Sequence, residues 1–219
     1  MRMRVVCISR TLGGGGQAFG KLVAEGLGYR YVDEAVLALA SHKAQINPGL
    51  VADAEHRRSL LDRVLGAMTS STAFERPTLE APASGMAYYG RGESMAAPPV
   101  PALRAVIRET IAELAVQGEA VIVAHAASMA LAGVEGVLRV LVTASEPTRV
   151  QRRLAGRHAA DEREAAKAVK QSDRERSNYL RDFYGVTEER PTHYDLVMNT
   201  DTLSAEQAAG ILIAAAEGR

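Results

Sequence analysis

The chain has 219 residues, which is long for one small domain and short for two, so a single domain over residues 1–219 with an insertion is expected. Its 26 basic and 26 acidic residues balance, which excludes the global positive field that attracts nucleic acid or a membrane surface. The single cysteine, Cys7, cannot form an internal disulfide, and the apolar stretch from Val5 to Ile8 is too short for a signal peptide. We therefore expect a cytoplasmic protein with neither nucleic-acid nor membrane partners.

Short apolar runs alternate with amphipathic segments along the chain. The runs predict buried strands at residues 4–9, 29–32, 121–124, 137–142 and 194–198. Helices are expected near residues 19–27, 35–42, 50–68, 101–117, from 146 onward, 161–184 and 203–217. This alternation predicts an α/β fold with a five-stranded parallel sheet and helices on both faces. Functional residues should then follow the carboxyl ends of the strands.

Residue types at the expected helix ends support this assignment. Gly28 is the expected C-cap of the first helix. Ser145 precedes Pro147, which suits the first position of a helix, and Ser204 with Gln207 forms a capping-box pattern. Residues 69–100 differ, because they are rich in Ser, Pro, Gly, Ala and Met and show no period, so we expect a mobile segment there.

Four consecutive glycines, Gly13, Gly14, Gly15 and Gly16, follow the first strand and precede a helix. Glycines let backbone N–H groups converge on a phosphate, and a helix N-terminus adds positive potential. A formal G-x-x-x-x-G-K pattern ends at Lys21, with Leu22 where Ser or Thr would hold magnesium.

A second register places the phosphate loop from Arg10 to Gln17. Neutral Gln17 then stands at the lysine position, and Arg10 lends charge from the other end of the loop. A glycine-rich turn that binds no ligand is the remaining alternative, because four glycines are costly to order.

Several blocks of the sequence together resemble the cytidylate kinase-like family of P-loop nucleoside monophosphate kinases. They occur in the family's order and are Ile8–Arg10 with the glycines, Gly28–Asp33, Val121–Val123, Val137–Val142, Asp173–Tyr179 and Tyr194–Thr200. The resemblance implies a three-layer P-loop fold that transfers a phosphoryl group from ATP, with Mg²⁺, to CMP, dCMP or a similar acceptor. It also implies an acceptor-side insertion at about 45–100 and a helical lid within about 146–185.

The resemblance assigns roles to the candidate site residues. ATP would lie on Arg10, the four glycines and Gln17. On the acceptor side it implies Asp33, His125, Asp173 and Arg176, with the carboxylate of Asp173 on a base amino group and Arg176 on a phosphate. Asp33 is equally suited to capping a helix, His125 to an ordinary hydrogen bond, and the Asp173–Arg176 pair to a solvent-exposed ion pair.

Arg149, Arg153 and Arg157 are spaced to share one helix face, and the resemblance places them on the lid. With Lys21, they would supply the catalytic positive charge, since lids neutralise transferring phosphates and exclude water. A solvated helix face with salt bridges is the alternative. The histidines and Cys7 show no metal-ligand spacing, so no protein-bound metal is predicted.

Two departures from the family pattern concern charge. Gln17 replaces a basic residue, and Ala124-His125-Ala126 replaces Gly-Arg-Gly after the third strand. Loss of a transition-state charge partner can cost on the order of 10³–10⁵ in rate. A nucleotide-binding module with little turnover, and a kinase for a non-nucleotide acceptor, therefore stay open beside the nucleoside monophosphate kinase.

Overall fold

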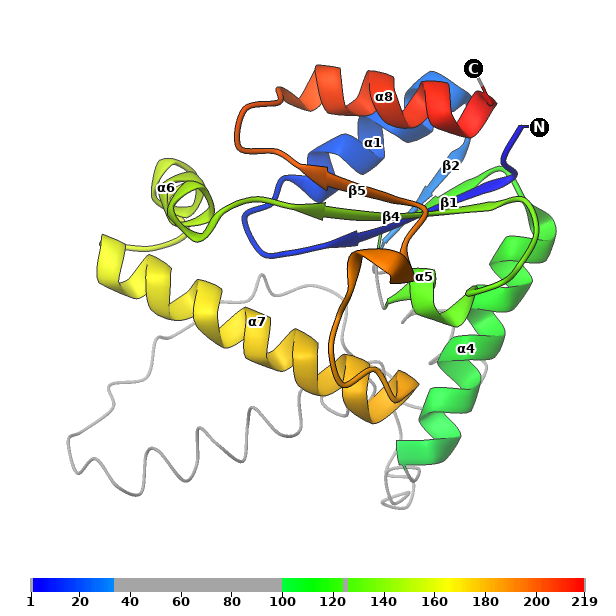
Figure 1. Ribbon diagram of the computed structural model, residues 1–219, viewed down its shortest axis with the longest axis horizontal. Coiled ribbons are helices and arrows are strands. Elements are labelled where there is room, and N and C mark those ends of the chain that lie inside the picture. Colours follow the sequence, from blue (N-terminus) through cyan, green and yellow to red (C-terminus); the bar gives the residue numbers. More distant parts are fainter. Residues whose placement is uncertain (1, 34–99, 124–125, 219) are drawn as a thin grey trace, which may run out of the picture.

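The computed structural model describes residues 2–33, 100–123 and 126–218, which form a sheet with helices on both faces (Figure 1). Its strands are β1 Val5–Arg10, β2 Arg30–Val32, β3 Ala120–Ile122, β4 Val137–Thr143 and β5 Leu196–Asn199. Its helices are α1 Gly16–Leu27, α4 Val100–Gln117, α5 Ala127–Ala130, α6 Glu146–Ala155, α7 Glu162–Tyr184 and α8 Ala205–Glu217, with a 3₁₀ turn, η1, at Pro191–His193.

The five strands are all parallel and lie in the order β2-β3-β1-β4-β5. β1 is central, with Val6 opposite Val121 of β3 on one side and Leu138 of β4 on the other. All carboxyl ends therefore meet at one edge, the edge toward which β4 and β5 point as they approach α6 in Figure 1. The expected α/β class and five-stranded parallel sheet are confirmed.

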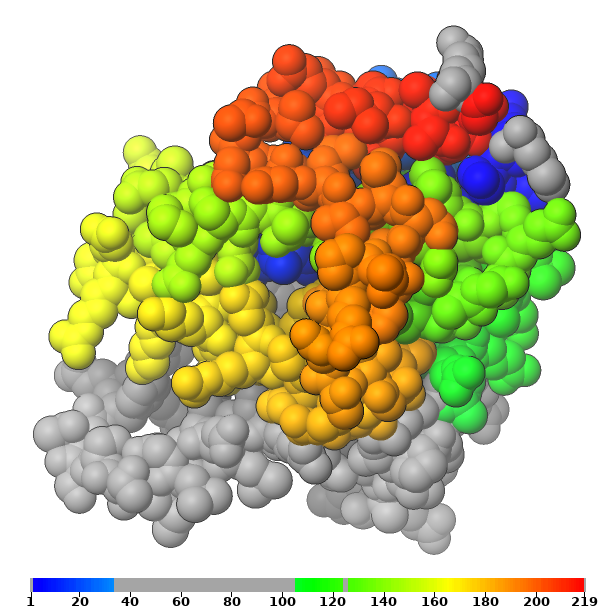
Figure 2. Space-filling view, in the orientation of Figure 1, coloured from blue at the N-terminus to red at the C-terminus, as the bar shows by residue number. Residues whose placement is uncertain are grey.

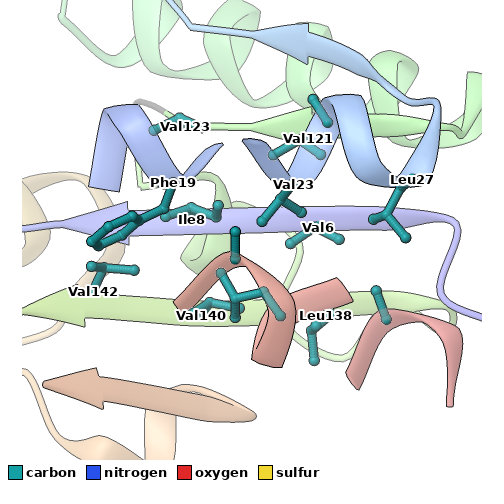
Figure 3. Close-up of a cluster of buried hydrophobic side chains, with 14 of the residues drawn as sticks. Val6, Ile8, Phe19, Val23, Leu27, Val121, Val123, Leu138, Val140 and Val142 are labelled. Atoms are coloured by element: carbon teal, nitrogen blue, oxygen red, sulfur yellow. The ribbon is translucent and has the colours of Figure 1, made fainter. Parts of the chain in front are cut away.

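Alternating side chains of β1 bury against two different layers. Val6 and Ile8 pack with α1 and α8, as the side chains of Phe19 and Val23 show in Figure 3. Val5 and Cys7 lie in a second cluster with α4 and α5. A strand buried on both faces reads as a continuous apolar run, which is why its sequence predicted a central strand.

Most expected elements are present, with differences at their ends. The capping box of Ser204 and Gln207 forms, and Gly28 adopts the left-handed C-cap conformation. Ser145 occupies the N-cap of α6, but its hydroxyl bonds Thr148 and Asp201 and makes no capping bond to a helix amide. α5 was not expected from the sequence. The helices expected at 35–42 and 50–68 lie outside the described residues, as does the expected insertion at 45–100 except for Val100, which begins α4.

Helices α6 and α7 pack against one another through Val150, Ala165 and Val169 beside the carboxyl edge of the sheet. Figure 2 shows them on one side of the molecule, with atoms of the N-terminal segment visible in a hollow between them. Among the described helices, none combines the length and the apolar character needed to cross a membrane.

Candidate functional site

The glycine segment makes a tight turn between β1 and α1. β1 ends at Arg10, α1 begins at Gly16, and Gly15 is the helix N-cap in the left-handed region at φ +85°. Gly13 has φ +79°, a backbone angle that residues other than glycine rarely adopt. The amide of Thr11 donates to the carbonyl of Val142 at 3.1 Å, which fixes the start of the loop against β4.

Close packing, as well as backbone conformation, requires glycine along this loop. A Cβ atom at Gly13 would lie 2.9 Å from the carbonyl oxygen of Arg149, and one at Gly15 would lie 2.8 Å from the ring of Phe19. At Gly14 it would lie 2.9 Å from the Thr11 hydroxyl oxygen, and at Gly16 it would lie 2.7 Å from Cβ of Arg10. The loop is therefore held tightly by its neighbours, with its backbone left uncovered by side chains of its own.

A cavity of about 430 Å³ opens against this loop. Residues 10–13 and 15–18 line one side, and Arg152, Arg153 and His158 line the other. The N-terminus of α1 opens into it, so unpaired helix N–H groups and the helix dipole favour an anion there. Its volume lies within the ordinary range for small-molecule sites, roughly 300–1,000 Å³.

The arginines that line the cavity differ from the neighbouring ones in their partners. Arg152 donates to neutral oxygens, at 3.3 Å to the carbonyl of Gly13 and at 2.9 Å to the hydroxyl of Thr200. Arg153 donates to the carbonyl of His158 at 2.8 Å, and its buried Nε has no hydrogen-bond partner among the described residues. Within the described part of the chain neither guanidinium is paired with a carboxylate, so no described acidic group offsets them beside the cavity.

Thr200 joins the glycine loop to the end of β5. Its buried hydroxyl donates toward the carbonyl of Gly14 at 3.0 Å and lies 3.1 Å from that of Thr143, and its backbone carbonyl accepts from Arg152. Arg152 is thereby held between the loop and the strand. The predicted stripe of arginines omitted Arg152, whose position one turn beyond Arg149 was the signal available in the sequence.

The three arginines of that stripe lie in different surroundings. Arg153 lines the cavity, whereas Arg149 is buried and makes a two-pronged ion pair with Asp173, with both N–O distances at 2.8 Å. Hydrogen bonding to Asp173 raises the pKa of Arg149, so it stays charged. Arg157 is exposed beyond the end of α6 at φ +55°, because the helix stops at Ala155.

Arg176 lies in a polar network beneath the loop, away from the cavity lining. It donates from Nε to Glu189 at 2.8 Å, from Nη2 to the hydroxyl of Tyr194 at 3.2 Å, and from Nη1 to the backbone carbonyl of Arg10 at 3.3 Å. Burial opposes ionisation of Glu189, but the bonds from Arg176 outweigh it and lower the pKa of that carboxyl. Burial, with Glu189 as acceptor, raises the pKa of Tyr194. Sequence reasoning assigned Glu189 and Tyr194 no such role.

Gln17 and Asp33 meet at the other side of the loop. The amide of Gln17 donates to Asp33 at 3.0 Å, and the hydroxyl of Tyr31 donates to the same oxygen at 3.1 Å. Burial and then Asp33 raise the pKa of Tyr31 to about 12. Lys21 is exposed on α1, where its amine lies 5.8 Å from the centroid of the Tyr31 ring and does not line the cavity.

The remaining predictions are only partly covered. His125 lies outside the described residues, as does the insertion at 45–100 apart from Val100. Within residues 2–33, 100–123 and 126–218, no group of three or more His, Cys, Asp or Glu side chains is placed to hold a metal ion.

The chain matches one family profile and resembles solved structures. The sequence profile of the cytidylate kinase-like family matches residues 5–202. No curated protein matches the chain. An uncharacterized protein from Eubacterium ventriosum ATCC 27560 is 16% identical with a TM-score of 0.61, over 98% of this chain and 99% of that one. A shikimate kinase from Bacteroides thetaiotaomicron is 14% identical with a TM-score of 0.49, over 96% of each chain.

With this family match, the parallel sheet and the glycine loop between its first strand and first helix make up a kinase-like P-loop fold. The chain belongs to the cytidylate kinase-like family.

Proposed function

We propose that this protein is an ATP-dependent phosphotransferase that transfers a phosphoryl group from ATP to CMP, dCMP or a similar small acceptor. The observation that carries the proposal is the cavity on the glycine loop, which joins a helix N-terminus to Arg152 and Arg153. Phosphoryl transfer depends on positioning and on positive charge around the phosphates more than on a protein nucleophile. A close-packed glycine turn meets both needs, with two arginines opposite it that no described carboxylate pairs.

The residues present suit the polyphosphate of ATP. Gly13, Gly15 and Gly16 line the cavity without side chains of their own, and Arg153 lines the opposite side with no carboxylate partner among the described residues. Helices α6 and α7 would act as the lid over residues 146–185. Mg²⁺ would come with the ATP and compensate phosphate charge. The carboxylate of Asp33 lies close to the start of α1, because it accepts a hydrogen bond from Gln17.

On the acceptor side, we assign Asp173 the contact with the base that the family resemblance implies. Its side chain is 41% exposed while both oxygens accept from Arg149, so acceptor binding and the lid helix would be coupled through one ion pair. The family resemblance would add Asp33 and His125 to this side, of which His125 lies outside the described residues. Arg176 is already engaged by Glu189, and its proposed contact with an acceptor phosphate would have to compete with that carboxylate.

A second candidate is a nucleotide-binding module with little turnover. It is favoured by Lys21, which lies over Tyr31, and by Gln17, whose amide is directed to Asp33. Neither residue adds positive charge to the cavity.

The test measures ADP release from magnesium ATP with CMP, dCMP, UMP, AMP and GMP, against a reaction without acceptor, and ATP binding by calorimetry in parallel. Turnover with CMP or dCMP well above the control supports the kinase. ATP binding without turnover on any nucleotide favours the binding module or a non-nucleotide acceptor. Absence of both binding and turnover refutes a nucleotide site on this loop.

A further inference from the structure

At the cavity, the side chain of Arg10 fills the space that a side chain on Gly16 would need. A Cβ atom on Gly16 would lie 2.7 Å from Cβ of Arg10 and 3.2 Å from its Cδ. The aliphatic part of Arg10 therefore runs across the first residue of α1. Since Cβ of Arg10 is fixed by the strand, any side chain at position 16 would force β1 or α1 to move.

Gly16 stands at the position where the P-loop motif has its lysine. In the pattern G-x-x-x-x-G-K, the lysine is the seventh residue, and its amine reaches the outer phosphates. Counting from Arg10, Gly15 is the sixth residue and Gly16 the seventh. The lysine position of this register is therefore Gly16, and the expectation that Gln17 stands there is wrong by one residue. Gly16 is also the first residue of α1. The chain thus has no side chain where the motif has its cation, and has an arginine where the motif has its first glycine.

Other positive groups do not fill this role. Lys21 is the sixth residue of α1 and lies over Tyr31, outside the cavity lining. Arg152 and Arg153 approach from α6, on the opposite side of the cavity. Arg10 lines the cavity from the loop itself, and its guanidinium has no carboxylate or hydrogen-bond partner among the described residues.

The backbone of Arg10 is held firmly. Its carbonyl accepts from Arg176 at 3.3 Å, and the following residue, Thr11, donates to Val142. Arg176 is itself fixed by Glu189 and Tyr194. A cation that acts on a transferring phosphate has to be pre-positioned, and this network provides the rigid support.

We propose that Arg10 supplies, from the end of β1, the phosphate-binding cation that a P-loop ordinarily takes from the first residue of its helix, and that Gly16 is glycine to make room for it. The inference rests on the proposed ATP site. It also gives a physical account of how this loop can bind a polyphosphate without a basic residue at position 17.

The first test compares the affinity of wild type and Arg10→Met for adenosine, AMP, ADP and ATP by calorimetry. Arg4→Met is the matched control, because Arg4 lies just before the opposite end of the same strand. Loss of one charge-assisted contact should weaken ATP binding by about 10- to 100-fold in Arg10→Met. Adenosine affinity should change less than about threefold, and Arg4→Met should bind all four ligands as wild type does.

The second test moves the cation. Gly16→Lys alone should lose ATP affinity, because its Cβ collides with Arg10. Arg10→Gly should bind ATP as weakly as Arg10→Met, and the double variant Arg10→Gly/Gly16→Lys should recover affinity to within about tenfold of wild type. Thermal unfolding of each variant shows whether a loss of binding is a loss of fold.

The outcomes separate the inference from the function on which it rests. Equal ATP affinity in wild type and Arg10→Met overturns the role of Arg10 and leaves the ATP site intact. Failure of the double variant to bind better than folded Arg10→Gly overturns the exchange of positions. No binding of ATP by wild type overturns the proposed function and the inference together.

Discussion

Replacement of Arg176 by Met decides between a structural and a ligand-binding role for that residue. In the structure the guanidinium holds Glu189, Tyr194 and the carbonyl of Arg10, with side-chain exposures of 19% for Arg176 and 21% for Glu189. Breaking a fully buried ion pair costs about 3–5 kcal/mol, because the remaining charge has no partner. Since about a fifth of each side chain reaches solvent, we expect a loss of about 2–3 kcal/mol in the free energy of unfolding.

The assay is urea unfolding followed by circular dichroism, with the melting temperature as a second measure. For a chain of this size each kcal/mol corresponds to roughly 2–4 °C, so Arg176→Met should melt about 4–12 °C lower. Arg190→Met is the matched control, because its pair with Glu188 is about two-thirds exposed and should contribute less than about 1 kcal/mol.

A double-mutant cycle with Glu189→Gln isolates the pair. The sum of the two single-variant losses in unfolding free energy should exceed the loss in the double variant by about 1–2 kcal/mol, because the two side chains interact directly. Additive losses, or an Arg176→Met protein that is as stable as wild type but binds CMP less tightly, would refute the structural role. The second result would instead support the acceptor-phosphate contact implied by the family resemblance.

Three further predictions follow from individual contacts. Gly13→Ala should destabilise the fold by about 1–3 kcal/mol more than Gly133→Ala in urea unfolding. Both glycines have φ near +80°, but only a Cβ at Gly13 would clash, with Arg149. Equal losses in the two variants would contradict a tightly packed loop. The pKa of Glu189 is lowered from its usual 4.5, so its contribution to stability is present above that pH and is lost as the pH falls through the pKa of the folded protein. The difference in unfolding free energy between wild type and Glu189→Gln should therefore narrow below about pH 4.5. A difference that stays constant with pH would argue against the ion pair. Burial raises the pKa of Cys7 to about 12, so a thiol reagent at pH 8 should modify it only in urea, and fast modification of the native protein would place it at the surface.

Much of the fold was predictable because its signals are local. Apolar runs such as Val5–Ile8 mark strands buried on both faces, and Ser204 with Gln207 marks a helix start. The spatial order of the strands depends on which runs pair, and no local pattern contains that information. The short helix α5 was missed because four residues are too few to show a period.

The site was predictable as a loop and less so as a set of side chains. Helical spacing placed Arg149, Arg153 and Arg157 on one face, yet α6 ends at Ala155 and leaves Arg157 outside the helix. The same spacing could not tell that Arg149 would be bound by Asp173, which lies 24 residues further along the chain. Side-chain roles here depend on long-range ion pairs, which a periodic pattern does not encode.

The partners of the arginines separate supporting residues from those available to a ligand. Arg149 and Arg176 are each neutralised by a carboxylate, and each one fixes α7 against another part of the molecule. Within the described residues, Arg10, Arg152 and Arg153 have no carboxylate partner, and these three line the cavity. These three side chains are partly buried, and a charge partly removed from water is stabilised when a group of opposite charge binds beside it. The concentration of such charges on one glycine loop therefore favours an anionic ligand, and it does so without any contribution from Gln17 or Lys21.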